Sequence, residues 1–246
     1  MRKILFNVFA RAVHRFPRFI ASGNKLMDIE APVKLANAMR ETKIDFVLDV
    51  GANLGQFGMG LRENGYLGPI HSFEPIPDIL GQLSRKVAHD TSWQCHGIAF
   101  GSSKGTLELN VTADPVFSSF LAPRHSDNAP FFEGNVIAKT ISVPVMTLDS
   151  WAAENSEKLR GREIFLKIDT QGFDLEVIRG AGELLKTVRL IQFEGACDPI
   201  YMDMPLMWDI LRVLSKLGFK IIDMFPVNRL GLCGQVVEYD CLMVRP

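Results

Sequence analysis

The sequence predicts an α/β fold, a doubly wound and mostly parallel sheet of seven strands with an antiparallel last strand. Three observations support this prediction. Short apolar runs alternate with segments of helical periodicity along the 246-residue chain, which is typical of parallel sheets with helical crossovers. The first strand ends in a glycine-rich turn, as in α/β sheets that bind ligands. Residues 227–240 show no helical pattern between the last two strands, so those strands should be antiparallel neighbours.

The first half of the chain predicts helices and strands in regular succession. Pro77 fits the first turn of a helix, where its missing N–H costs nothing. In order, we expect a helix at 31–42, a strand at 46–50, a helix at 55–62, a strand at 70–75, a helix at 77–88, and strands at 93–101 and 105–111.

The second half begins with the least regular stretch, residues 112–135. A loop of this length in a compact domain is usually functional or disordered. Strand-like pattern returns at 141–151, where Asp149 or Ser150 is placed to cap a helix. The remaining expected elements are a strand at 164–170, a helix at 174–188, a strand at 189–196, a helix at 205–218, and strands at 220–225 and 241–246.

Composition narrows the function classes. A net charge of -1 offers no electrostatic case for nucleic-acid binding. The four cysteines and five histidines form no CxxC, HExxH or zinc-ligand spacing, so we expect free thiols and no bound transition metal. The sequence contains no run of eighteen apolar residues, the length that would be needed to span a membrane. We therefore expect a cytoplasmic protein.

Residues 1–30 differ from the domain expected at 31–246. Five basic residues lie within residues 1–23, no acid precedes Asp28, and apolar residues recur at helical spacing. Interruption of the apolar run by Asn7 and Arg11 argues against a secretory signal. We predict a short basic amphipathic helix. It could pack or mediate a homodimer, contact a membrane surface peripherally through residues 1–20, or help to bind an anionic substrate.

The stretch FVLDVGANLGQFG, from Phe46 to Gly58, carries the strongest ligand signal. A triphosphate loop needs a lysine, and none lies between Lys43 and Lys86. A dinucleotide loop needs GxGxxG, and its second glycine allows the backbone to approach the pyrophosphate. Here Asn53 stands in place of that glycine.

S-adenosylmethionine is the third candidate. The loop offers small residues for close approach, and Asp49 offers a carboxylate for the ammonium group of this donor, directly or through water. Glu74, at the end of the second strand, suits a ribose diol, although a dinucleotide would use the same acid. Asp49 and Asn53 together favour the methyl donor.

Through this stretch and five further motifs, the sequence resembles the FkbM-type methyltransferase family. The resemblance covers roughly Asp45 to Ala196. Gln171 stands where the family frequently has Glu, and Asp174 stands where Glu is common. The motifs that carry it are FVLDVGANLGQFG, FEPIP, GIAFGSSKGTLELNV, VFSSFL, VPVMTLDSW and FLKIDTQGFDLEVIRGA.

The resemblance implies S-adenosylmethionine-dependent O-methylation of a hydroxyl on a sugar, a glycan or a secondary metabolite. The expected donor contacts are Asp49, Gly51, Ala52, Asn53, Gly55, Gln56, Phe57, Glu74, Pro75, Ala99 and Asp169.

Catalytic candidates lie where strands end, because ligands bind beyond the carboxyl ends of parallel strands. Asp169 is the expected general base or acceptor-orienting carboxylate, and Glu194 is the second candidate. Lys167 would pair with a strand-end acid or place a substrate anion. Two carboxylates could also hold a divalent ion, although no metal-ligand spacing predicts one.

Two other functions stay open. A non-catalytic nucleotide-binding module is compatible with Gln171, since an amide cannot take a proton at neutral pH. An NAD-dependent oxidoreductase is disfavoured by Asn53 and by the lack of a Tyr-x-x-x-Lys pair.

Overall fold

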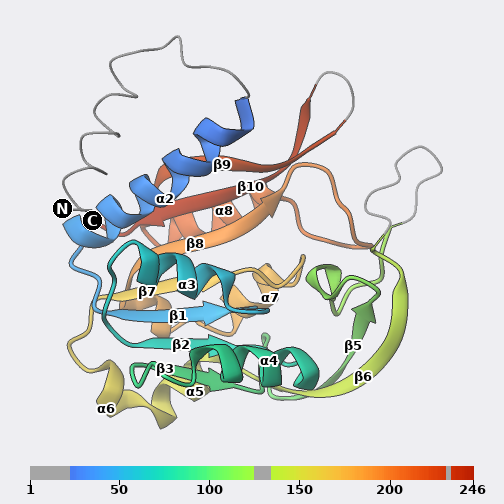
Figure 1. The fold of residues 1–246 in the computed structure, drawn as a ribbon, viewed down its shortest axis with the longest axis horizontal. Helices are drawn as coiled ribbons and strands as arrows, with labels where there is room; N and C mark the ends of the chain where they lie inside the picture. The colour runs from blue at the N-terminus through green and yellow to red at the C-terminus, as the bar shows by residue number, and fades with distance from the viewer. Residues whose placement is uncertain (1–22, 125–133, 231–233) are drawn as a thin grey trace.

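A computed structural model describes residues 23–124, 134–230 and 234–246 of the chain. Its central seven-stranded sheet has the order β3-β2-β1-β7-β8-β10-β9 (Figure 1). As predicted, the sheet is mostly parallel, and β10 runs antiparallel to both of its neighbours. The strands of this sheet are β1 (Phe46–Val50), β2 (Ile70–Phe73), β3 (Trp93–His96), β7 (Ile164–Ile168), β8 (Val188–Ala196), β9 (Lys220–Leu230) and β10 (Gln235–Val244).

Helices cover both faces of this sheet (Figure 1). One face packs against α2 (Gly23–Glu41), α3 (Gln56–Glu63) and α4 (Pro77–Val87). The opposite face packs against α5 (Leu148–Glu154), α7 (Asp174–Arg179), the 3-10 turn η2 (Leu184–Lys186) and α8 (Met207–Lys216), and the short helix α6 (Ser156–Leu159) follows α5.

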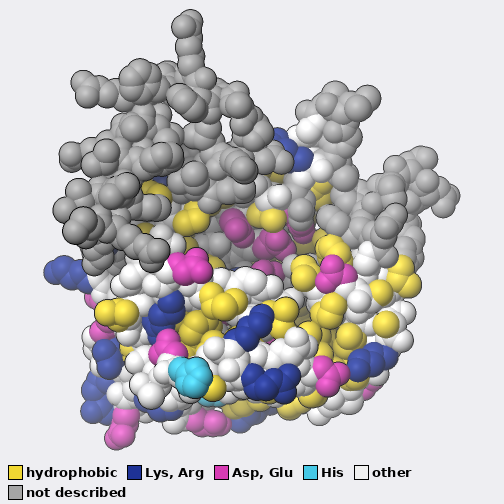
Figure 2. All heavy atoms as spheres, viewed as in Figure 1, with side chains coloured by type: hydrophobic (Ala, Val, Ile, Leu, Met, Phe, Trp, Pro, Cys, Tyr) yellow, Lys and Arg dark blue, Asp and Glu magenta, His cyan; other side chains and the backbone are white. Residues whose placement is uncertain are grey.

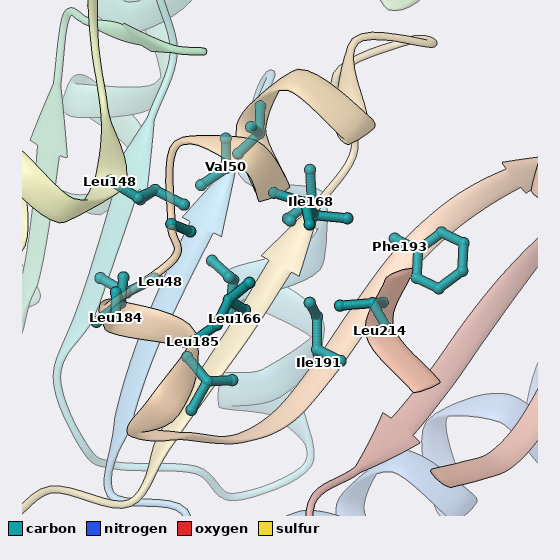
Figure 3. Close-up of a cluster of buried hydrophobic side chains, with 14 of the residues drawn as sticks. Leu48, Val50, Leu148, Leu166, Ile168, Leu184, Leu185, Ile191, Phe193 and Leu214 are labelled. Carbon is teal, nitrogen blue, oxygen red and sulfur yellow. The ribbon is translucent and has the colours of Figure 1, made fainter. Parts of the chain in front are cut away.

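The larger apolar core lies on the second of these faces. Successive side chains of a strand point to opposite faces, so alternate residues of the central strands enter this core. Leu166 and Ile168 of β7 are both fully buried there, and Figure 3 shows them beside Leu184, Leu185 and Leu214 from the covering segments. This packing holds the central strands in place, and with them the residues at the carboxyl ends of those strands.

A smaller sheet with the order β4-β6-β5 lies beside the central one. Its apolar residues pack against the start of α4. Within residues 112–135, the described part forms a short 3-10 turn that follows β5 directly. The elements are β4 (Ala99–Phe100), β5 (Gly105–Thr112), η1 (Pro115–Phe117) and β6 (Ile137–Met146).

Two expected elements are divided by glycines. The strand predicted at 93–101 is two strands, β3 and β4, which belong to different sheets on either side of Gly97. The helix predicted at 174–188 ends at Arg179. A Cβ atom on Gly180 would lie 2.1 Å from the carbonyl oxygen of Gly101, so the chain requires glycine there and the helix stops.

The predicted helix cap at residues 149–150 is wrong. Thr147 caps α5, because its side chain accepts a hydrogen bond from the backbone N–H of Ser150 at 3.1 Å. The Asp149 carboxylate instead accepts hydrogen bonds from the backbone N–H groups of Glu183 and Leu184.

The chain ends also differ from the sequence expectation. The last two strands are longer than predicted, since β9 and β10 occupy much of the connection expected at 227–240. The amphipathic helix expected in residues 1–30 falls largely in residues 1–22, which lie outside the described residues, and α2 begins at Gly23. No helix in the described part of the chain has the length and apolar character needed to cross a membrane.

Candidate active site

A cavity of about 340 Å³ opens at the carboxyl ends of β1, β2 and β7, the expected place for a ligand in such a sheet. Acidic side chains gather in a hollow near the centre of the face shown in Figure 2. The residues that line this cavity, here called the donor cavity, include Gly51, Ala52, Asn53, Gln56, Phe57, Glu74, Pro75, Ala99, Lys167, Asp169, Gln171, Gln192 and Asp240.

The loop after β1 is shaped by close backbone contacts. A Cβ atom on Gly51 would lie 1.8 Å from the carbonyl oxygen of Asp169, so no side chain fits there. Asn53 adopts a left-handed backbone with φ of 47°, a conformation that Asn tolerates better than most residues. Gly55 precedes α3 with φ of 81° and faces Leu83 rather than the cavity. The loop therefore presents backbone directly to the cavity.

Glu74 ties this loop to β2. Its two carboxylate oxygens accept hydrogen bonds from the backbone N–H groups of Asn53 and Ile76, each at 2.9 Å. Burial raises the pKa of Glu74 to about 7, although both hydrogen bonds act against the shift. Each oxygen keeps a second lone pair, so ribose hydroxyls could still donate to this carboxylate.

Asp49 lies behind the cavity wall, fully buried. It accepts a hydrogen bond from the Ser72 hydroxyl at 2.9 Å, and its Oδ1 lies 3.4 Å from Nζ of Lys167. Burial raises the pKa of Asp49 against the opposing charge of Lys167. The predicted contact between Asp49 and the ammonium group of the donor would therefore pass through water, because the Lys167 ammonium has no hydrogen-bond acceptor.

Lys167 joins β1 to β7 at this edge of the sheet. Its Nζ donates to the carbonyl oxygen of Gly51 at 3.0 Å and lies 3.3 Å from Oδ2 of Asp169. Burial alone would lower the pKa of Lys167, but the charges of Asp169 and Asp49 outweigh this effect and raise the pKa above its ordinary value. Lys167 is thus a buried cation held between two carboxylates.

Gln171 bridges the two predicted catalytic carboxylates. Its Nε2 donates to Oδ1 of Asp169 and to Oε2 of Glu194, both at 2.9 Å. Its Oε1 accepts a hydrogen bond from the Tyr201 hydroxyl at 2.9 Å, and its backbone carbonyl accepts one from the Ser119 hydroxyl. Gln171 therefore connects Asp169 and Glu194 with Tyr201 and Ser119 in one hydrogen-bond network.

The carboxyl groups around this network have unusual acidities. Burial, and then the charge of Asp169, raises the pKa of Glu194 well above its ordinary value. The same two causes raise the pKa of Asp174 to about 7 and that of Asp240 to about 6. Raised pKa values of this kind concentrate at functional sites, although structural networks also produce them.

The structure brings together most of the residues predicted from the sequence. Asp49, Gly55 and Glu194 are the exceptions, because they do not line the donor cavity. Glu194 reaches it only through Gln171. Sequence reasoning missed Asp240 and Tyr201. Asp240 lies opposite Glu194 in the antiparallel pair of β10 and β8, and no local pattern predicts that register.

The acidic cluster is not arranged as a metal centre. Among the residues that the structure describes, no three His, Cys, Asp or Glu side chains come together as a set of metal ligands.

Comparison with known proteins gives one family. The Methyltransferase FkbM domain matches residues 49–221. Methyltransferase sdnD of Sordaria araneosa is 28% identical over 160 residues, which cover 56% of this chain and 61% of that protein. The chain therefore matches less than two thirds of the length of this relative.

Solved structures with a similar fold are distant in sequence. Precorrin-6y C5,15-methyltransferase of Geobacter metallireducens GS-15 is 12% identical, with 87% of this chain and 88% of that chain covered and a TM-score of 0.45. Aeropyrum pernix fibrillarin, solved with natively bound S-adenosyl-L-methionine, is 12% identical, with 81% and 66% covered and a TM-score of 0.44.

The fold and the family match together define a Rossmann-like methyltransferase of the S-adenosylmethionine-dependent class. The domain match covers more than half of the sequence, and the chain belongs to the FkbM methyltransferase family. This assignment sets aside the nicotinamide-dependent alternative.

Proposed function

We propose that this chain is an O-methyltransferase that methylates a hydroxyl of a sugar, a glycan or a secondary metabolite, with Asp169 as the general base. The position of Asp169 carries the proposal. Asp169 directly follows the last residue of β7, its side chain is 35% exposed, and it lines the donor cavity. Lys167 and Gln171 supply a cation and an N–H donor to its two oxygens.

The donor would lie against the loop that follows β1. Gly51, Ala52 and Asn53 would approach it with backbone, Gln56 and Phe57 would meet it from the start of α3, and Glu74 would bind its ribose. Pro75 and Ala99 would then line the adenine side. S-adenosylmethionine supplies an activated methyl group, so the protein mainly contributes alignment.

In the proposed reaction, the acceptor oxygen forms a bond to the methyl carbon while the bond from that carbon to sulfur breaks. S-adenosylhomocysteine leaves, and the acceptor proton passes to Asp169. Burial raises the pKa of Glu194 well above its ordinary value, which favours its neutral form and would limit the negative charge beside the base. The amide of Gln171 would fix the distance between the two groups.

This arrangement supports an enzyme over a non-catalytic module. An amide at position 171 removes one potential base, but it leaves Asp169 in the cavity and donates to it. Gln171 is therefore compatible with catalysis.

Donor binding is tested by calorimetric titration with S-adenosylhomocysteine, and with NAD as the parallel control. We expect micromolar binding of the first compound, about -8 kcal/mol, and none of the second. Binding of NAD alone would overturn the assignment of the cavity.

The base is tested with Asp169→Asn. Transfer of a tritiated methyl group to a mixture of hydroxylated metabolites should fall by about 10²-fold or more, while affinity for S-adenosylhomocysteine stays near that of the wild type. Loss of that affinity would make Asp169 a structural residue instead.

A further inference from the structure

A second cavity, of about 560 Å³, lies between α2 and α3 on the face of the sheet that carries Lys167. It shares the residues Gln56, Phe57, Gln192 and Asp240 with the donor cavity. The two spaces therefore meet across one wall, and a molecule in the second cavity, here called the α2–α3 cavity, could reach the donor.

Most of the wall of the α2–α3 cavity is apolar. The apolar side chains come from α2, α3, the segment before β1, the segment between α3 and β2, and the edge strand β9. They are Ala31, Pro32, Leu35, Ala36, Met39, Ile44, Phe57, Leu61, Tyr66 and Phe225.

Polar side chains are confined to the two ends of this cavity. Arg40, Glu63 and Asn64 are exposed and lie where α2 and α3 end. Gln56, Gln192 and Asp240 lie at the other end, on the wall shared with the donor cavity. A ligand that fills the cavity would thus meet polar groups at its ends and apolar groups along its middle.

This distribution discriminates between classes of acceptor. A polyhydroxylated ligand in the middle of the cavity would leave its hydroxyl groups without hydrogen-bond partners, which is costly. An apolar body would gain from leaving water at the same place. A single hydroxyl could still reach the shared wall, where Gln192 and Asp240 offer hydrogen-bonding groups.

We propose that the α2–α3 cavity binds the methyl acceptor and selects a hydroxylated molecule with a largely apolar body over a free glycan. The proposal deepens the function proposed above and rests on it. The acceptor enters between the ends of α2 and α3, its apolar body lies along Leu35, Met39 and Phe225, and its hydroxyl faces the donor cavity past Phe57.

Two helical glycines give a matched test. Gly60 of α3 lines the α2–α3 cavity, and a Cβ atom added there meets no atom of the described residues within 4 Å. Gly81 of α4 is equally open but lines neither cavity. Gly60→Leu should fill the cavity, Gly81→Leu should leave it open, and both substitutions raise helix propensity.

The probe is N-phenyl-1-naphthylamine, an uncharged apolar fluorophore, titrated into the full chain. We expect saturable binding to the wild type and to Gly81→Leu, and at least a tenfold weaker affinity in Gly60→Leu. Ala36→Phe, which fills the cavity from α2, should repeat the loss if Gly60→Leu does not fold. Absence of binding to the folded wild type, or equal binding to Gly60→Leu, would overturn the proposal.

Competition separates the two acceptor classes. Decan-1-ol should displace the probe, whereas methyl glucoside at the same concentration should not. Displacement by the sugar alone would overturn the assignment to an apolar acceptor.

Calorimetry with S-adenosylhomocysteine distinguishes failure of this inference from failure of the proposed function. Gly60→Leu should bind that compound as tightly as the wild type, because it changes only the α2–α3 cavity. If the wild type bound the probe but not S-adenosylhomocysteine, the proposed function would fail, and the acceptor assignment would fail with it.

Discussion

On one face of the central sheet, three apolar side chains lie side by side and fully buried: Leu48, Leu166 and Ile191. The next residue along each of these strands points to the other face, and these residues are Asp49, Lys167 and Gln192. The first row packs into the larger apolar core. The second row links buried charges and reaches both cavities.

The difference between the two rows teaches how one set of strands serves stability and chemistry together. Alternate residues of a strand face opposite ways, so a shift of one residue would exchange the two faces. The apolar row specifies the register, and that register places the polar row at the site.

The largest effect on stability is expected from Lys167→Met on the polar face. Removing one partner from a buried ion pair typically costs about 3–5 kcal/mol, and here the buried carboxylate of Asp49 would lose its cation. Urea unfolding at pH 7 measures the loss. An unchanged free energy of unfolding would mean that the ion pair contributes nothing net to stability.

Leu166→Ala tests the apolar face one residue away. A buried Leu→Ala substitution costs about 2–5 kcal/mol. Because the side chain points away from the donor cavity, affinity for S-adenosylhomocysteine should stay near the wild-type value in the folded fraction. A large loss of affinity would show that the two faces are not independent.

The third prediction concerns the response of the apolar face to acid. His96 stacks there between His71 and Phe73, and Trp151 meets these rings edge-on. Nδ1 of His71 lies 3.0 Å from Nε2 of His96. Burial, and then the nearby His96, lowers the pKa of His71 from 6.5 to about 4.

Because the unfolded chain binds the proton more readily, stability should fall as the pH drops from 6.5 to about 4, by on the order of 2 kcal/mol. Thermal unfolding across this range measures the loss. The double variant His71→Phe and His96→Phe should show a smaller loss, and the same loss would assign it to other groups.

The smallest effect is expected from Glu194→Gln on the polar face, where the sign is reversed. A carboxyl group with a raised pKa binds its proton more tightly in the folded state, so its stability contribution is lost as the pH rises through that pKa. The neutral amide should therefore stabilise the protein at pH 8, by about 1 kcal/mol, and change little at pH 5. Greater stabilisation at pH 5 than at pH 8 would contradict the raised pKa of Glu194.

Much of the fold can be predicted from the sequence because it follows from local patterns. Apolar runs alternate with helical segments, and a missing crossover predicts the antiparallel closing strand. The errors come from contacts between segments that are distant in sequence. Gly180 stops a helix because the backbone of Gly101 lies against it, a contact between segments that sequence reasoning could not place.

The candidate site was only partly predictable. Asp169 and the loop after β1 belong to one motif, so the sequence points to them directly. Asp240, Tyr201 and the role of Gln171 depend on contacts between distant segments. Asp240 meets Glu194 only because β10 pairs with β8 in one register, and Tyr201 reaches Gln171 across thirty positions of sequence.

The close approach of Gly51 to Asp169 has a consequence for how such a protein could diversify. The backbone N–H of Asp169 donates to the carbonyl oxygen of Val50 at 3.0 Å, so two neighbouring strands hold the β1 loop and Asp169 in a fixed relation. The walls of the α2–α3 cavity belong to other elements. Over evolutionary time, those walls could change to suit new acceptors while the spacing between the β1 loop and Asp169 was inherited intact.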